Sequence, residues 1–420
     1  MTSLPTSTPP ALDSLHGLSV GDALGAQFFL PDHRDLLNRR QAPPGPWPWT
    51  DDTEMACSVH AARTERGGID TFDLTHAFAR RHDFDRGYGP AANRLLRLVR
   101  EGGDAPRLAA ALFDGRGSYG NGAAMRVAPL GAAHAADPAG VVRPAADTAV
   151  ITHTHPQAVD GAIAVAVAAA YAVRARTEPT SPERFLAAVA ALTPPGAVRR
   201  GIAEALRLTG ADPLSAARVL GNGSRVSAAD TVPFALWVAA RRLTDYPTAI
   251  WETIGAGGDV DTTAAIVGGV VAARTGTAGI PAGWLAAREP LPDWATPAPG
   301  SVAAAPVPRC PIQLPRPAPV PPVRWSEEHW QRIRSGLLPP AAAGRLATHT
   351  AEGVLHVHLA TGPAPRTTVP ATGPALAEIT VEPLPGPDGG WRPVSAVVEA
   401  HPRHHDGEGA PLVARLLALL

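Results

Sequence analysis

Two short acidic motifs have residue types and spacing that could bind divalent cations. The first is WTDDT, residues 49–53, and the second is GGDVDTT, residues 257–263. In each motif, aspartate and threonine follow a turn rich in glycine or proline and precede an apolar run, so their side chains fall at a predicted helix start. In the first motif, Thr50 or Asp51 is the predicted N-cap. Clustered carboxylate and hydroxyl oxygens without cysteine favour Mg²⁺, Mn²⁺ or Ca²⁺ over zinc or copper.

Taken singly, each motif is more simply explained as a solvated helix cap, because acidic residues at a helix N-terminus complement the helix dipole. Two such motifs in one helical region favour a shared site, in which two cations would lie roughly 3.5–4 Å apart. Asp22, in GDALG, has two equally weighted interpretations. It either supports this site or makes a buried contact between helices.

A glycine-rich loop, GSYGNG at residues 117–122, could present backbone N–H groups to an anion. A helix is predicted to start just after it, near Ala123. The simpler interpretation is an ordinary turn. Likewise, His153 and His155 in THTHP could bind metal, but a hydrogen-bonded loop is the preferred interpretation. Pro156 is predicted to be the first residue of a long apolar helix.

The periodicity of the chain predicts an all-α domain followed by a smaller module. Residues 1–10 are predicted to be disordered, and helical spacing of apolar residues dominates residues 11–295. Ten prolines in residues 296–323 predict a linker. Short alternating runs between proline and glycine turns then predict a small α+β module at residues 324–420.

The composition of the chain restricts the cellular compartment and the classes of partner that we expect. The chain has 420 residues, of which 45% are hydrophobic and 18% charged, with a net charge of −1. No basic stripe is present, so nucleic acid is an unlikely partner except as a modified substrate. Two cysteines and no signal-like N-terminus favour a cytoplasmic protein. The apolar stretches are shorter than the roughly 20 residues that cross a bilayer, so we expect no membrane span. We also expect a monomer.

Five motifs, taken together and in order, resemble those of the ADP-ribosylglycohydrolase family, of the dinitrogenase-reductase-activating glycohydrolase type. They are GLSVGDALG, WTDDT, GSYGNGAAMRVAPLG, ITHTHPQAVDGA and GGDVDTTAAIVGG, and they cover about residues 15–290. The resemblance implies a compact, orthogonal bundle of many helices. It also implies a hydrolase that removes ADP-ribose from a modified protein or small molecule.

The resemblance also implies roles for individual residues. The ligands of two Mg²⁺ ions, with Mn²⁺ as an alternative, would be Thr50, Asp51, Asp52, Asp259, Asp261 and Thr262. Asp51 or Asp52 would orient or deprotonate the attacking water. The substrate would lie along Gly117, Ser118, Tyr119, Gly120 and Asn121, with Met125 and His153 lining the pocket.

One departure from the family concerns the segment after GDALG. Many relatives have a glutamate there, whereas this chain has Phe28 and Phe29. We expect the two rings to form an apolar wall at the mouth of the metal site. The departure leaves the linkage open, with a slight preference for an N-glycosidic bond over a serine linkage. Two alternatives to the hydrolase remain: a silent ADP-ribose-binding or structural protein, and a dimetal hydrolase of another nucleotide or glycoside.

Overall fold

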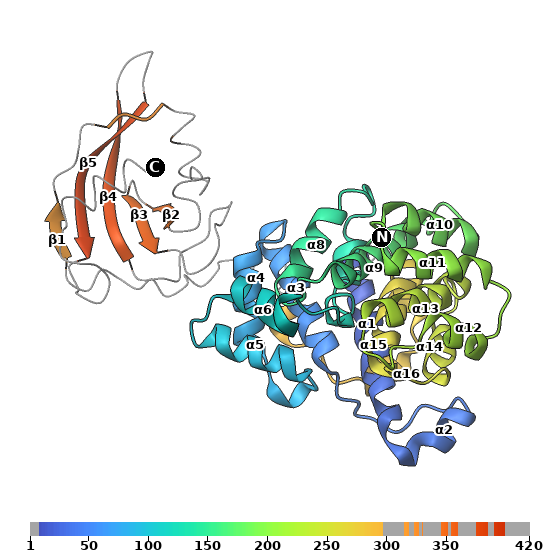
Figure 1. The fold of residues 1–420 in the computed structure, drawn as a ribbon. Helices are drawn as coiled ribbons and strands as arrows, with labels where there is room; N and C mark the ends of the chain where they lie inside the picture. The colour runs from blue at the N-terminus through green and yellow to red at the C-terminus, as the bar shows by residue number, and fades with distance from the viewer. Residues whose placement is uncertain are drawn as a thin grey trace, which may run out of the picture. The chain divides into compact units, whose positions relative to one another are not determined.

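The chain divides into two compact units, residues 1–297 and residues 298–420. The computed structural model describes residues 8–296, 315–318, 323–326, 330, 346–351, 354–359, 375–384 and 390–399. The first unit is helical and the second contains an antiparallel sheet (Figure 1). The predicted fold class, all-α with a small additional module, is confirmed.

The α-helices of the first unit are mostly short, and several begin with proline in the first turn. Their bounds are α1 (Pro10–Ala26), α2 (Arg34–Asn38), α3 (Asp51–Arg66), α4 (Thr71–Arg81), α5 (Pro90–Arg100), α6 (Ala105–Gly115), α7 (Ala128–Ala132), α8 (Val142–Val150), α9 (Pro156–Arg174), α10 (Pro182–Leu192), α11 (Ala197–Arg207), α12 (Pro213–Leu220), α13 (Ala228–Arg241), α14 (Tyr246–Gly255), α15 (Val260–Thr275) and α16 (Ala282–Ala287). Single 3-10 turns connect some of them, at η1 (Gln27–Phe29), η2 (Pro31–His33), η3 (Phe84–Arg86), η4 (Asn121–Ala123), η5 (Thr277–Gly279) and η6 (Asp293–Ala295).

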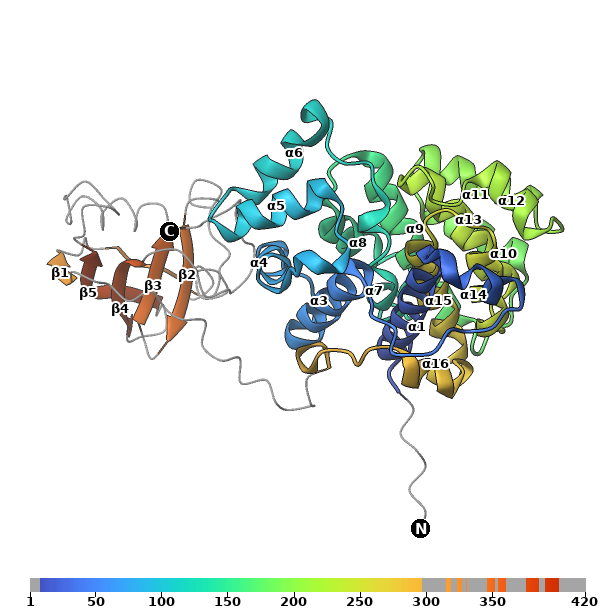
Figure 2. The ribbon, with the colours of Figure 1, turned by 90° about the horizontal axis from the view of Figure 1, so that it is seen from below.

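Three apolar helices, α1, α9 and α15, lie in the middle of the helical unit. Helices α3 to α6 lie on one side of them and α10 to α14 on the other, in both views (Figures 1 and 2). Helix α9 begins at Pro156, as predicted. By length and composition α9 could cross a membrane, but 72% of the apolar window that meets this test is buried inside the unit. That degree of burial is typical of a core helix.

Helices α1 and α15 pack with their backbones in contact, because glycines on α1 face the start of α15. A Cβ atom added at Gly21 would lie 2.1 Å from the carbonyl oxygen of Ala264. One added at Gly25 would lie 2.5 Å from the carbonyl oxygen of Val260. Because glycine carries no side chain at either position, the two helices can approach closely. This close approach holds Asp22 on α1 beside the start of α15.

The starts of α3 and α15 are the two acidic motifs. Thr50, one of the two residues predicted as N-cap, is the N-cap of α3, and its hydroxyl accepts the N–H of Asp52 at 3.4 Å. Asp259 precedes α15 after a turn in which Gly257 and Gly258 have φ of 67° and 82°. Only glycine adopts this left-handed backbone without strain, so the turn fixes where α15 begins.

The second unit contains a five-stranded antiparallel sheet with the order β1-β5-β4-β3-β2. The strands are β1 (Pro315–Ala318), β2 (Leu346–Ala351), β3 (Val354–Leu359), β4 (Ala375–Leu384) and β5 (Gly390–Glu399). The last four coincide with the alternating runs in the sequence.

Strand β1 corrects one prediction, because it lies inside the segment interpreted as a proline-rich linker, residues 296–323. Pro315 pairs with Glu399 at the edge of the sheet. Proline is tolerated there because an edge strand can leave one of its two sides without hydrogen bonds. The rest of that segment, apart from Thr296 and Val323, lies outside the described residues, as do residues 1–7 of the predicted disordered N-terminus.

We expect the helical unit to fold without the second unit. Its large apolar cluster of buried side chains runs from Leu15 to Ala295 and is contained within that unit. A chain ending at Pro297 should therefore unfold in one cooperative transition, measured by calorimetry beside the full chain. A broad transition without a heat-capacity peak would show instead that residues 298–420 complete the core.

Candidate metal and ligand site

The two acidic motifs meet in one cluster of oxygen atoms. Carboxylate oxygens of Asp22, Asp52 and Asp261 lie within 4.8 Å of one another. The hydroxyl oxygen of Thr50 is 2.9 Å from Asp52 Oδ2, and that of Thr262 is 3.4 Å from the same oxygen. The N-terminal ends of α3 and α15 therefore face each other, although 210 residues separate Asp52 from Thr262.

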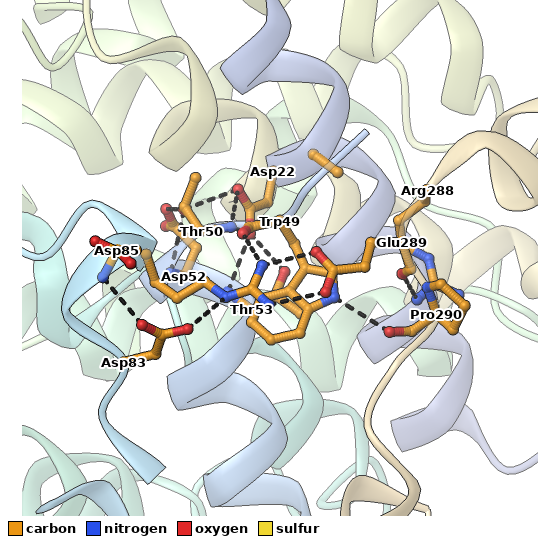
Figure 3. Close-up of polar contacts among 12 residues, drawn as sticks. Asp22, Trp49, Thr50, Asp52, Thr53, Asp83, Asp85, Arg288, Glu289 and Pro290 are labelled. Carbon is orange, nitrogen blue, oxygen red and sulfur yellow. Dashed lines mark hydrogen bonds and ion pairs between the residues drawn. The ribbon is translucent and has the colours of Figure 1, made fainter. Parts of the chain in front are cut away.

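Asp22, near the C-terminal end of α1, holds the start of α3 in place (Figure 3). Its two carboxylate oxygens accept the backbone N–H and hydroxyl of Thr50 and the backbone N–H and hydroxyl of Thr53. A carboxylate has about four lone-pair positions, so these bonds use most of its capacity. Asp22 therefore acts mainly on Thr50 and the helix start. From the sequence, this role and a contact between helices were equally weighted, although an aspartate among small residues of a buried helix is itself a signal.

Burial and mutual repulsion raise the pKa of the clustered carboxyl groups. For Asp51, burial comes first and the charge of Asp22 second, and they raise the pKa to about 8. Burial raises the pKa of Asp22 to about 6, although its hydrogen bonds from threonine oppose the shift. The pKa values of Asp52 and Asp261 are also raised, by burial and then by neighbouring aspartates. Raised pKa values on four neighbouring carboxyl groups indicate that no positive charge nearby compensates their ionised forms.

The cluster fits a hard divalent cation. In the described part of the chain, no arginine or histidine forms an ion pair with Asp22, Asp51, Asp52 or Asp261. Asp52 Oδ1 is buried and has no hydrogen-bond partner among the described residues. An unsatisfied buried carboxylate oxygen is costly, and a cation would satisfy it. The donor set, all carboxylate and hydroxyl oxygen, is the set that Mg²⁺ and Ca²⁺ prefer.

A cavity of about 400 Å³ opens beside this cluster. Its lining contains most of the residues expected to bind ligand or metal: Asp51, Ser118, Tyr119, Gly120, Asn121, Met125, His153, Asp259, Asp261 and Thr262. Thr50 and Asp52 lie behind this lining, in the acidic cluster. Gly117 is outside the lining and packs on the next loop, since a Cβ there would be 2.0 Å from Thr154 Oγ1.

The glycine-rich loop has a different structure from the predicted one. A helix does not start near Ala123; only the 3-10 turn η4 forms there, and α7 begins at Ala128. The backbone N–H of Gly120 donates to Ser118 Oγ at 3.3 Å, and that of Asn121 donates to the carbonyl of Val226 at 3.3 Å. These two N–H groups are therefore not available to an anion. The loop is instead held by the segment before α13.

Asn121 links the loop to the acidic cluster. Its amide donates to Asp259 Oδ2 at 2.7 Å and to Thr231 Oγ1 at 3.1 Å. Both amide hydrogens are used, so Asn121 orients Asp259 in the cavity wall. Residues of the acidic motifs and of the glycine-rich loop thus line the same cavity.

Another part of the cavity lining is held by hydrogen bonds to Glu54, which no motif in the sequence indicated. Glu54, on α3, accepts the phenol of Tyr88 at 2.6 Å and the N–H of Asp83 at 3.2 Å. This pair of bonds fixes the segment from which Gly87 and Gly89 line the cavity. Glu54 follows Asp52 by two residues, and the sequence contains no local sign that the two carboxylates serve different purposes.

A second missed contact fixes the segment that leads into Thr50. Arg86 stacks on the ring of Trp49 at 3.5 Å and donates two hydrogen bonds to Glu289, at 2.7 and 2.8 Å. The indole of Trp49 donates to the carbonyl of Pro290 (Figure 3). Two-point arginine–carboxylate pairs are geometrically specific, so this contact positions Trp49 and, through it, the start of α3.

The prediction that Phe28 and Phe29 form a wall at the metal site is wrong. Neither residue lines the cavity. Helix α1 ends at Ala26, and the 3-10 turn that follows directs the two rings apart. The Phe28 ring packs edge-on against Trp251, 5.7 Å between centroids, whereas Phe29 is 53% exposed.

Because their surroundings differ, a charged side chain should lower the free energy of unfolding by different amounts at the two positions. Phe29→Glu should change the free energy of unfolding by less than about 0.5 kcal/mol, as exposed substitutions usually do. Phe28→Glu should lower it by about 1–3 kcal/mol, because a polar group would replace a packed ring. Denaturant titration of both variants tests the pair. Equal losses would mean that Phe29 is also packed.

A family model described as ADP-ribosylglycohydrolase matches residues 8–308. The chain is 29% identical over 319 residues to ADP-ribosylhydrolase ARH3 of Bos taurus, covering 64% of this chain and 86% of that protein. It is 33% identical over 186 residues to ARH3 of Xenopus tropicalis, covering 41% of this chain and about half, 52%, of that protein.

A bacterial relative is more distant. The ADP-ribosyl-[dinitrogen reductase] glycohydrolase of Rhodospirillum rubrum is 26% identical over 289 residues, covering 66% of this chain and 88% of that protein. The residues that the family model matches include the whole described part of the helical unit, residues 8–296.

Proposed function

This chain belongs to the ADP-ribosylglycohydrolase family, and we propose that it is a Mg²⁺-dependent hydrolase that releases ADP-ribose from a modified protein side chain or another acceptor. The observation that carries the proposal is the joining of the two acidic helix starts beside one cavity. Carboxylates of the acidic motifs and residues of the glycine-rich loop line the same cavity, and the carboxylates suit a cation that binds the hydroxyl groups of a ligand.

Six residues would hold two Mg²⁺ ions, namely Thr50, Asp51, Asp52, Asp259, Asp261 and Thr262. When bound, Mg²⁺ supplies Lewis-acid polarisation and lowers the pKa of water. Asp22 would support the set by fixing Thr50 through two hydrogen bonds. Mn²⁺, which also prefers oxygen ligands, could replace Mg²⁺.

Of the two candidate catalytic carboxylates, Asp51 is the one in contact with the cavity. Asp52 is buried behind it, with its Oδ2 2.9 Å from the hydroxyl oxygen of Thr50 and 3.4 Å from that of Thr262. We therefore assign to Asp51 the orientation or deprotonation of the attacking water, a role that requires hydrogen-bond reach of the reacting atoms. Asp52 would serve as a ligand.

The test is incubation of the purified chain with Mg²⁺ and substrates carrying ADP-ribose on arginine, on serine or on a nucleobase. Release of free ADP-ribose from at least one of them, abolished by EDTA and by Asp51→Asn, is the expected result. The substrate that reacts identifies the linkage. Binding of ADP-ribose without its release from any substrate would favour a silent member of the family. Hydrolysis of a different nucleotide or glycoside would favour a dimetal hydrolase with another substrate.

A further inference from the structure

Arg126 is fully buried and contributes to the inner wall of the cavity. Its Nη2 donates to the carbonyl of Thr148 at 2.7 Å and to Thr152 Oγ1 at 3.0 Å. Its guanidinium also lies 4.6 Å from the ring centroid of Phe78. A guanidinium donates hydrogen bonds and cannot accept them, so the oxygen of Thr152 must be the acceptor of this bond.

The hydroxyl of Thr152 then has one proton to donate. Its oxygen lies 2.7 Å from His153 Nδ1, and within the described residues this nitrogen is the one acceptor in reach of that proton. Nδ1 therefore accepts. Burial, and then the charge of Arg126, lower the pKa of His153 to about 3, so the ring is neutral. A neutral imidazole carries one proton, and the hydrogen-bond network places it on Nε2.

The Nε2 atom of His153, one of the residues that line the cavity, lies beside two glycines of the loop. A Cβ added at Gly120 would lie 3.2 Å from this nitrogen, and one added at Gly122 would lie 3.1 Å from it. A side chain at either position would crowd the imidazole. In the described part of the chain, no acceptor is found for the Nε2 proton. It is thus a donor at the same loop whose Gly120 and Asn121 N–H groups are already bonded.

We propose that Arg126 and Thr152 are positioning residues that hold His153 as the Nε2–H tautomer, so that it donates a hydrogen bond to a phosphate oxygen of the bound diphosphate. The ligand in this inference rests on the proposed function, but the tautomer does not. The other tautomer would direct a nitrogen lone pair at the anion, which repels it. A neutral donor fixed before binding needs no rearrangement when the ligand arrives.

The tautomer is measured on the full-length free protein labelled with ¹⁵N-histidine, by long-range proton–nitrogen correlation. His153→Gln identifies the His153 signals by their loss. We expect a protonated Nε2 and an unprotonated Nδ1 in the wild type and in Thr152→Ser, which keeps the hydroxyl. Thr152→Val keeps the shape but not the hydroxyl, and should lose this preference. A proton on Nδ1 in the wild type, or an unchanged tautomer in Thr152→Val, would overturn the proposal.

The consequence for binding is measured by calorimetry with ADP-ribose. Thr152→Val should bind roughly tenfold more weakly, the order expected for losing a hydrogen bond to a charged group, and Thr152→Ser should match the wild type. In a His153→Gln background, where the amide replaces the imidazole donor, Thr152→Val should have no further effect. Equal binding by Thr152→Val and the wild type would overturn the role in binding. If the wild type itself did not bind ADP-ribose, the proposed function would be wrong, and the NMR result would still decide the tautomer.

Discussion

Replacing Asp261 with asparagine is expected to lower the rate of ADP-ribose release by roughly 10³-fold. Asp261 lies in the carboxylate cluster with Asp22 and Asp52 and also lines the cavity. A cation that polarises the reacting bond contributes several kcal/mol, and each 1.36 kcal/mol corresponds to a factor of ten in rate. Asparagine keeps the size of the side chain and one oxygen, so the loss would come from charge.

The same variant should change stability in opposite directions with and without Mg²⁺. Burial and the charge of Asp259 raise the pKa of Asp261, so its ionised form destabilises the cation-free fold at neutral pH. Asp261→Asn should therefore melt at or above the wild-type temperature in EDTA, and gain less than the wild type when Mg²⁺ is added.

The control for this experiment is Asp147→Asn, which removes an aspartate outside the cluster that pairs with exposed Arg143. It should leave both the rate and the response to Mg²⁺ unchanged. If Asp261→Asn retained the wild-type rate and the wild-type stabilisation by Mg²⁺, the assignment of the cluster as a cation site would be wrong.

The second large effect is expected at Gly21, where α1 touches the backbone of α15. Gly21→Ala places a Cβ 2.1 Å from the carbonyl oxygen of Ala264, so the helices must move apart. We expect the free energy of unfolding to fall by about 3 kcal/mol, the upper end for overpacking, despite a gain of about 1 kcal/mol in helix propensity. Because Asp22 follows directly, affinity for Mg²⁺ should fall as well.

Gly255→Ala is the matched control, because Gly255 also lies in a helix but has no atom within 4 Å of its added Cβ. That variant should be as stable as the wild type or up to about 1 kcal/mol more stable. Denaturant unfolding and Mg²⁺ titration of the two variants measure both effects. Equal stability of the two would show that the contact between α1 and α15 adjusts at no cost.

The sequence by itself determined the class of fold and the local starts of the site helices. Thr50, one of two predicted caps, caps α3, and Pro156 begins α9 as predicted, because caps and first-turn prolines act on backbone groups within a few residues. The four strands β2 to β5 were also visible, since alternation and proline or glycine turns are local signals. The family resemblance depended on the order of five such motifs.

Tertiary structure alone decided which of these residues meet and which groups remain free. Asp22 bonds to Thr53 across 31 residues, and Asp52 meets Thr262 across 210. The N–H of Asn121 is used by Val226, so a loop that looked suited to anions keeps fewer donors than its glycines suggested. Phe28 turned towards Trp251 rather than towards the metal site. Each of these outcomes depends on a hydrogen bond or ring contact between segments that are distant in the sequence. Those contacts are set by the close packing of helices such as α1 and α15. Local periodicity does not determine which helices pack together.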